Sequence, residues 1–158
     1  MEIRHAEPQD AEGIHDIALK SWKDAYSRFL SEDTIEEVIE DWYSVEDLEE
    51  ETGDQIFYVA EKDGKVVGFV HATIEDGGAS LHRIYLDPDY QRQGIGSKLY
   101  ERMMKELPET TEKIELEVLA ENKKGKSFYR KKGFETQETE EIELKGEKVE
   151  QKILVKRL

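Results

Sequence analysis

The 158-residue sequence contains no cysteine, which excludes disulfides, thiolate metal sites and a cysteine nucleophile. It has only three prolines and no linker, low-complexity tract or repeat, so residues 1–158 are expected to form a single domain. No apolar run approaches the roughly 18 residues of a membrane span, and the opening MEIRHAEPQD is neither a signal nor a transit peptide. We therefore expect a soluble, cytoplasmic protein with no membrane partner.

Basic residues are outnumbered by acidic ones. The chain has 23 Lys and Arg against 38 Asp and Glu, a formal net charge of −15, which argues against nucleic acid as a partner. Twelve acids and no basic residue lie between Glu32 and Asp54, whereas residues 122–134 hold six basic residues and no acid. The acidic run has two interpretations: a solvated helix face, as in a halophilic adaptation to a salty cytoplasm, or an electrostatic funnel for a cationic substrate.

The apolar spacing predicts a mixed α/β (α+β) domain with the element order β-α-α-β-β-β-α-β-α-β-β. A first strand lies near Ile3, and two helices follow, the second of which carries Ile35 to Trp42 and also Leu48. The later elements are a hairpin over 55–74, a strand over 79–88, a helix over 95–107, a strand over 112–122, a helix over 123–132 and a final hairpin. The sheet is expected to be mostly antiparallel, with one parallel pair formed through a right-handed crossover between residues 81 and 119.

Two glycines open the helix expected over 95–107, in the stretch YQRQGIGSKL. Glycine destabilises a helix interior, so Gly94 and Gly96 suggest that a phosphate approaches bare backbone N–H groups. The P-loop pattern G-x-x-x-x-G-K-[ST] is absent. A dinucleotide fingerprint fits poorly, because its third glycine position is Leu99 and a seven-residue loop separates the preceding strand from Gly94.

A third interpretation comes from a family resemblance. QRQGIG fits the pattern Q/R-x-x-G-x-G/A, and IYLDPDYQRQGIGSKLYERMM resembles the acetyl-CoA-binding segment of the GNAT superfamily of N-acetyltransferases. ENKKGKSFYRKKGF is similar to that superfamily's N-x-x-A-x-x-F-Y-x-K-x-G-F stretch, with Gly125 in the place of the usual Ala; this exchange is expected only to loosen helix packing beside the cofactor. The resemblance implies a GNAT-like three-layer domain with helices on both faces of the sheet.

The resemblance also implies where acetyl-CoA binds. Backbone N–H groups from Gln93 to Lys98 would hold the diphosphate at a helix N-terminus, and pantetheine would lie along the strand that contains Ile84 and Leu86. Lys123, Lys124 and Lys126 would lie near the 3′-phosphate, or else form a solvated helix end. The predicted cofactor-binding residues are Ile84, Tyr85, Leu86, Gln91, Arg92, Gln93, Gly94, Ile95, Gly96, Ser97, Lys98, Asn122, Lys126 and Tyr129.

For the chemistry, Tyr129 matches the family tyrosine that acts as general acid toward the leaving thiolate, and the Leu86 N–H is the expected oxyanion donor. With no cysteine, direct attack by the amine in a ternary complex is simpler than an acetyl-enzyme. Family members often carry a glutamate on the strand before Pro88, and this chain does not. His82 is the nearest substitute as general base. Glu75, Asp76 and the acids of the second helix are the alternatives.

Trp22, Tyr26 and Trp42 either line the acceptor pocket or pack in the core. The four histidines lack metal-ligand spacing, so we predict no metal. The leading hypothesis is an acetyl-CoA-dependent N-acetyltransferase that acts on a primary amine, small or peptidic and cationic. The alternative is a non-catalytic CoA-binding sensor or interaction module with the same fold. The resemblance also makes a homodimer an expectation.

Overall fold

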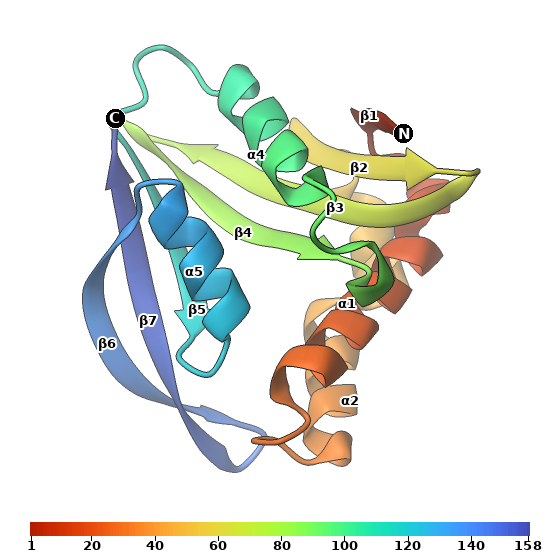
Figure 1. The fold of residues 1–158 in the computed structure, drawn as a ribbon, viewed down its shortest axis with the longest axis vertical. Coiled ribbons are helices and arrows are strands. Elements are labelled where there is room, and N and C mark those ends of the chain that lie inside the picture. The colour runs from red at the N-terminus through yellow and green to blue at the C-terminus, as the bar shows by residue number, and fades with distance from the viewer.

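A computed structural model describes all residues, 1–158, as one seven-stranded sheet with helices on both faces (Figure 1). The strands are β1 (Glu2–His5), β2 (Ile56–Lys62), β3 (Lys65–Glu75), β4 (Gly78–Leu86), β5 (Lys113–Leu119), β6 (Glu135–Leu144) and β7 (Glu147–Arg157). The helices are α1 (Ala11–Tyr26), α2 (Glu32–Trp42), α3 (Val45–Glu51), α4 (Ile95–Glu106) and α5 (Lys123–Lys131), with 3-10 turns at Pro8–Asp10 and Pro88–Tyr90. None of the helices combines the length and the apolar composition that crossing a bilayer would need.

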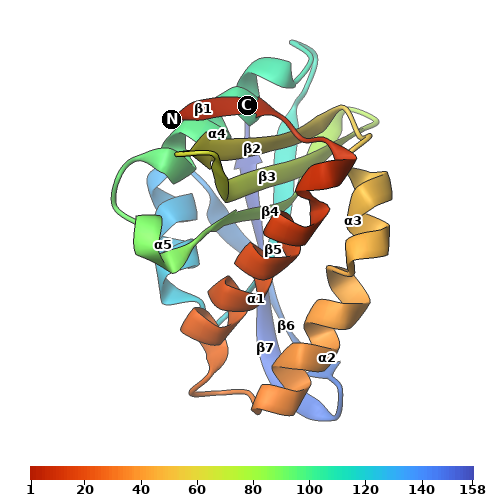
Figure 2. The same ribbon diagram turned by 90° about the vertical axis from the view of Figure 1, so that its right-hand side faces the viewer.

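The sheet order is β1-β2-β3-β4-β5-β7-β6, and every neighbouring pair is antiparallel except β4 and β5. This confirms the predicted mixed α/β architecture with one parallel pair. Helices α1, α2 and α3 cover one face of the sheet, and α4 and α5 cover the other, as the two views show (Figures 1 and 2). Each face has its own hydrophobic cluster, one built around α1 to α3 and one around α4. Alternation along the strands sends successive side chains to the two clusters.

One predicted helix is two helices. The sequence suggested that Leu48 continued the helix of Ile35 and Trp42, but α2 ends at Trp42 and α3 begins at Val45. Tyr43 leaves the helical conformation with φ −135° and ψ 33°. Ser44 then caps α3, because its hydroxyl accepts a hydrogen bond from the Asp47 N–H at 3.2 Å. The apolar period runs through the break because both helices face the same cluster.

Strands β4 and β5 pair only at their beginnings. Gly78 to Ser80 pair with Lys113 to Glu115, after which the strands diverge although β4 continues to Leu86 and β5 to Leu119 (Figure 1). A bulge on the other side of β4 coincides with the divergence. His71 pairs with Arg83 and Ala72 with Leu81, so His82 is the extra residue. The paired ends and the bulge together open a wedge in the middle of the sheet.

Candidate functional site

The wedge between β4 and β5 is the mouth of a cleft of about 1320 Å³. Its lining comes from α1, the α2–α3 junction, β4, β5, the loop before α4 with the first turn of that helix, α5 along its length, and Gln151 of β7. A second hollow, of about 430 Å³, lies beside α2 and has only charged side chains: Asp33, Glu36, Glu37, Glu40, Asp41 and Lys145. Only the larger cleft has the mixture of apolar and polar groups that a coenzyme thioester needs.

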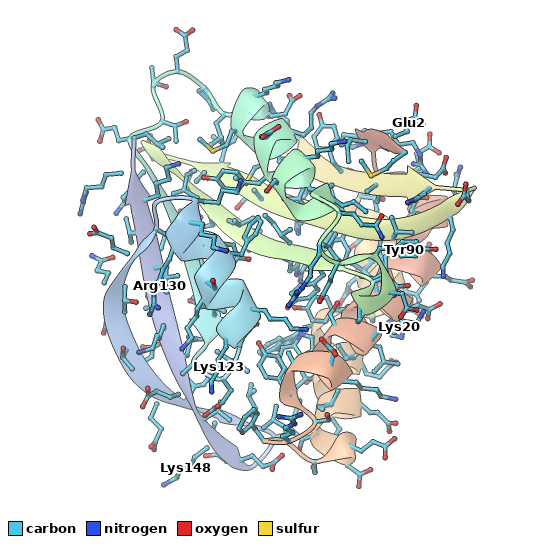
Figure 3. The ribbon with its side chains drawn as sticks, viewed as in Figure 1. Glu2, Lys20, Tyr90, Lys123, Arg130 and Lys148 are labelled. Atoms are coloured by element: carbon cyan, nitrogen blue, oxygen red, sulfur yellow. The ribbon has the colours of Figure 1, made fainter.

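The loop between β4 and α4 begins at a buried carboxylate. Asp87 accepts a hydrogen bond from the Asp89 N–H at 3.0 Å and pairs with Lys20 at 3.3 Å. Burial alone would raise the pKa of Asp87, but these hydrogen bonds and Lys65 hold it below its usual value. Asp87 therefore stays ionised and fixes the start of the loop to α1 and β3, beside Lys20 and Tyr90 (Figure 3).

The rest of this loop exposes a run of backbone donors. From Gln91 to Ser97 no backbone N–H donates to an acceptor within the protein. Gly94 occupies the left-handed region at φ 77°, where a side chain is strained, and it turns the chain into α4. Free N–H groups at a helix N-terminus form an anion site, so the arrangement fits a diphosphate. Lys98 is a correction: its N–H donates to the Gly94 carbonyl at 3.1 Å and belongs to the helix.

Basic side chains flank this loop on two sides. Lys124 of α5 contacts Gln91 Oε1 at 3.2 Å and Asp24 at 3.4 Å, and Figure 3 shows Lys123 at the end of α5 nearest to α1. Lys62, at the end of β2, donates to Gln93 Oε1 at 3.0 Å. The sequence analysis missed Lys62, because nothing in the sequence relates the β2–β3 hairpin to this loop. The side chains of Gln93, Lys98 and Lys126 lie outside the cleft lining.

Gly125 stands where the resembled pattern has Ala, and the structure shows what the missing methyl group permits. A Cβ at Gly125 would lie 2.6 Å from Asn122 Nδ2. Without it, Asn122 Oδ1 accepts the Gly125 N–H at 2.9 Å and caps α5. The exchange therefore does more than loosen the helix packing: it selects the side-chain conformation of Asn122, which lines the cleft.

The edge of β4 that faces the wedge carries unpaired backbone groups. The Asp87 N–H donates to the Val67 carbonyl, so by antiparallel alternation the odd residues of this segment bond to β3. Ile84 and Leu86 therefore direct their N–H and C=O groups toward the wedge. The Leu86 carbonyl accepts a hydrogen bond from the Ser21 hydroxyl at 3.0 Å. The backbone of Tyr85 belongs to the β3–β4 ladder, so the backbone groups directed at the wedge are those of Ile84 and Leu86, while Tyr85 lines the cleft between them.

Tyr129 of α5 reaches the cleft from the side of the sheet covered by α4 and α5. The residue is buried, and burial, with a smaller contribution from the Tyr43 phenol, raises its pKa well above the usual value. The phenol is therefore protonated at neutral pH, in the state that can donate a proton or hydrogen bond. Asn122 and Tyr129 line the same cleft as the Gly94 loop, so the two sequence motifs meet in space.

His82 lines the cleft from the bulge of β4. Its Nε2 lies 2.9 Å from Thr73 Oγ1, and its ring lies 4.9 Å from the ring of His71. Burial lowers the pKa of His82 below its usual value, and the Arg83 guanidinium lowers it further against the opposing effect of nearby carboxylates. The imidazole is therefore neutral at pH 7. The alternatives considered for a base, Glu75, Asp76 and the carboxylates of α2, do not line the cleft.

Comparison with known proteins agrees with this geometry. Residues 12–134 match the model of the acetyltransferase (GNAT) family. The spermidine N(1)-acetyltransferase of Thermoplasma acidophilum is 34% identical over 149 residues, which cover 89% of this chain and 91% of that protein. The crystal structure of the PaiA N-acetyltransferase of the same organism, in complex with coenzyme A, has a TM-score of 0.83 at 32% identity, covering 99% of this chain and 98% of that one. The Escherichia coli alanine N-acetyltransferase of ribosomal protein bS18 is 36% identical over 74 residues, 46% of this chain and 50% of that protein.

The chain belongs to the GNAT acetyltransferase family. It is an acetyl-CoA-dependent N-acetyltransferase, and acetyl-CoA is its cosubstrate. The free N–H groups before α4, the unpaired edge of β4 and the wedge beyond it are features of this chain that fit the diphosphate and the extended arm of that thioester.

In this GNAT enzyme the aromatic candidates divide between core and cleft. Trp22 and Tyr26 are 3% and 5% exposed and belong to the core cluster, and both also line the cleft. Trp42 is 41% exposed, and its ring meets the ring of Trp22 edge-on at 5.7 Å. Sequence reasoning missed Tyr43, which is buried and whose hydroxyl lies 2.8 Å from that of Tyr85.

Two carboxylates of the cleft were also missed. Ile114, Leu116 and Val118 of β5 belong to the cluster under α4, so Glu115 and Glu117 point to the opposite face, the one covered by α1 to α3. Both line the cleft. The alternation was visible in the sequence, but only the divergence of β4 from β5 leaves these carboxylates facing open space.

Proposed function

We propose that this enzyme transfers the acetyl group to a primary amine of a polyamine-like, multiply cationic acceptor, by direct attack in a ternary complex. The spermidine N(1)-acetyltransferase relative supports this class of acceptor. The acceptor enters on the face covered by α1 to α3, opposite to the face of α4 and α5, and the thioester lies between them in the wedge.

The observation that carries this proposal is the combination of side chains on the acceptor face. Glu115 and Glu117 lie two residues apart on β5, about 6.6 Å along the strand at a rise of 3.3 Å per residue. The exposed ring of Trp42 lies on the same face. Carboxylates and an indole face are the groups that bind ammonium ions, the first by charge and the second by cation–π attraction. A second ammonium group on the acceptor would bind there while the first reacts.

The reaction requires three groups around the thioester carbonyl. The acceptor nitrogen attacks the carbonyl carbon and gives its proton to His82, which is neutral at pH 7. The Leu86 N–H stabilises the oxyanion that forms on the carbonyl oxygen. As the carbon–sulfur bond breaks, the Tyr129 hydroxyl protonates the leaving thiolate of coenzyme A. Solvent then carries the proton from His82 back to Tyr129.

The test measures free thiol as acetyl-CoA is incubated with spermidine, with butylamine and with a peptide amine. Because the protein has no cysteine, every thiol comes from coenzyme A. We expect spermidine to be acetylated with the lowest KM. Tight coenzyme A binding without turnover of any amine would instead support the sensor alternative.

A variant pair locates the acceptor. Glu117→Gln should raise the KM for spermidine by about 10-fold, the size of one lost ionic hydrogen bond, and change that for butylamine less. Glu138→Gln, on the exposed face of β6 outside the cleft, is the matched control. Equal KM values in both variants would contradict acceptor binding at β5.

The homodimer, the cytoplasmic location, the absence of nucleic acid as a partner and the salt adaptation stay predictions from the sequence.

A further inference from the structure

The junction between α2 and α3, residues 42–44, is held to the rest of the molecule in an unusual way; we call it the elbow. The last carbonyls of a helix have no partner within the helix. Here side chains from two other elements donate hydrogen bonds to the carbonyls of Trp42 and Tyr43. Arg83 Nη2 of β4 donates to the Trp42 carbonyl at 3.1 Å, and His15 Nδ1 of α1 donates to the Tyr43 carbonyl at 2.7 Å.

Arg83 makes more contacts than this one. Its Nη1 donates to Glu51 Oε2 of α3 at 2.8 Å and to His71 Nδ1 of β3 at 3.0 Å. Because Nδ1 accepts, the proton of His71 is on Nε2, which donates to Asp54 at 2.8 Å. The guanidinium also stacks on the Tyr43 ring, 4.6 Å from its centroid. One side chain thus joins α2, α3, β3 and β4, and Glu51 neutralises its charge.

The elbow and the bulge of β4 face one another through Arg83. A bulge places two successive residues on the same side of a strand, so His82 and Arg83 both lie on the acceptor face. His82 lines the cleft, and Arg83 donates a hydrogen bond to the backbone carbonyl of Trp42, which also lines the cleft. The guanidinium therefore ties the backbone of Trp42 to the strand that carries His82.

We propose that Arg83 is a positioning residue. It holds the Trp42 ring at the place where the acceptor binds beside His82. The inference rests on the proposed function, that a cationic amine enters beside Trp42. A planar guanidinium is needed, because it donates in fixed directions to a carboxylate, an imidazole and a carbonyl while it stacks on a ring. A lysine ammonium keeps the charge and loses this geometry.

The test compares Arg83→Lys with Arg102→Lys. Arg102 of α4 is a matched control outside the cleft, since its guanidinium lies 4.6 Å from the Tyr58 ring centroid and pairs with Glu106 at 3.3 Å. In Arg83→Lys the KM for spermidine should rise by about 10-fold or more, the factor for one lost charge-assisted hydrogen bond. The kcat should change less, and the Kd for acetyl-CoA should be unchanged. Arg102→Lys should leave all three values as they are. An unchanged KM in a folded Arg83→Lys protein overturns the proposal.

A second measurement does not depend on turnover. The chain has two tryptophans, so its NMR spectrum has two indole N–H signals, and Trp42→Phe assigns them. Spermidine should shift the Trp42 signal in the wild type, and Arg83→Lys should move or broaden that signal without ligand. If spermidine is acetylated but leaves the Trp42 signal unmoved, this inference fails while the proposed function stands. If no amine is acetylated, the proposed function fails.

If Arg83→Lys does not fold, His15→Leu removes the other anchor of the elbow. It should raise the KM for spermidine in the same direction, by a smaller factor, and leave the Kd for acetyl-CoA unchanged. Equal KM values in His15→Leu and the wild type would overturn the role of the elbow anchors.

Discussion

One side of the cleft presents mainly backbone groups, and the other side presents mainly side chains. The side that we propose for coenzyme A presents seven consecutive backbone N–H groups, from Gln91 to Ser97, that one local conformation sets free. The side that we propose for the acceptor presents side chains from α1, the elbow, β4 and β5, which the sheet brings together. A backbone site depends on glycine and on the start of a helix, whereas a side-chain site depends on register, bulges and helix breaks far apart in the chain. Four experiments test this difference between the two sides.

The largest effect is expected from Gly94→Glu. The substitution places a carboxylate at the anion site and a Cβ at φ 77°, although no atom lies within 4 Å of that Cβ. Acetyl-CoA affinity, measured by isothermal titration, should fall on the order of 100-fold or more, since repulsion replaces ionic hydrogen bonds. Gly77→Glu is the matched control, with φ 74° and equally open surroundings in the β3–β4 turn. Equal losses of affinity in both variants would show that strain, and not the anion site, is responsible.

Tyr129→Phe should lower kcat by about 100-fold, the lower end of what general acid catalysis contributes. The KM for acetyl-CoA should change little, because the ring remains in place. Steady-state kinetics with Tyr100→Phe provide the control, since Tyr100 is a buried tyrosine of α4 outside the cleft. A kcat that survives in Tyr129→Phe would remove the phenol from the proposed mechanism.

The pH dependence tests His82. Its pKa is lowered, so the neutral base persists at pH 7 and is lost only as the pH falls below the ordinary value of about 6.5. Below that lowered pKa, kcat should fall about 10-fold per pH unit. His82→Gln should have a low and flat acid limb. The same acid limb in both proteins would assign the base to another group, with Glu115 and Glu117 as the next candidates.

The smallest effect concerns stability on the acceptor side. Burial lowers the pKa of His71, and Arg83 and His82 add to this against the effect of the hydrogen bond that His71 donates to Asp54. The unfolded chain therefore binds more protons just below pH 6.5, and the free energy of unfolding should decrease as the pH falls through this range. One group contributes at most about 1.4 kcal/mol per pH unit. Urea unfolding of His71→Asn from pH 7.5 to 5 should give a shallower slope than the wild type, and an equal slope would contradict a neutral His71.

The order of the elements was readable from the chain because it depends on local signals. Asp63-Gly64 predicts the β2–β3 turn, Pro88 ends β4, and Gly94 marks the start of α4. Leu48 was misplaced because the apolar period of α2 and α3 is continuous, and the break depends on Tyr43 and Ser44. The apolar spacing could not predict the wedge, because the bulge at His82 has no sequence signature in this chain.

More of the backbone side of the cleft than of the side-chain side could be predicted from the sequence. The glycines in the sequence predicted free N–H groups from Gln93 to Lys98, whereas the free run in the structure is Gln91 to Ser97, so the prediction began two residues late and ended one residue late. Tyr129 and Asn122 were predicted through a motif in which they are close neighbours, and both line the cleft. Lys62, Tyr43 and Glu117 were missed, because each becomes part of the site through strand order or strand divergence rather than through its neighbours in sequence.

The local chemistry is encoded in short stretches of the chain: a helix start with bare N–H groups, a phenol and an amide beside one short helix, and strands whose apolar and polar side chains alternate. These follow from backbone preferences over a few residues. Three features depend on how the elements pack together: the divergence of β4 from β5, the shared face of His82 and Arg83, and the hydrogen bond from an arginine to the end of α2. Register and packing are properties of pairs of elements, and no single segment contains them.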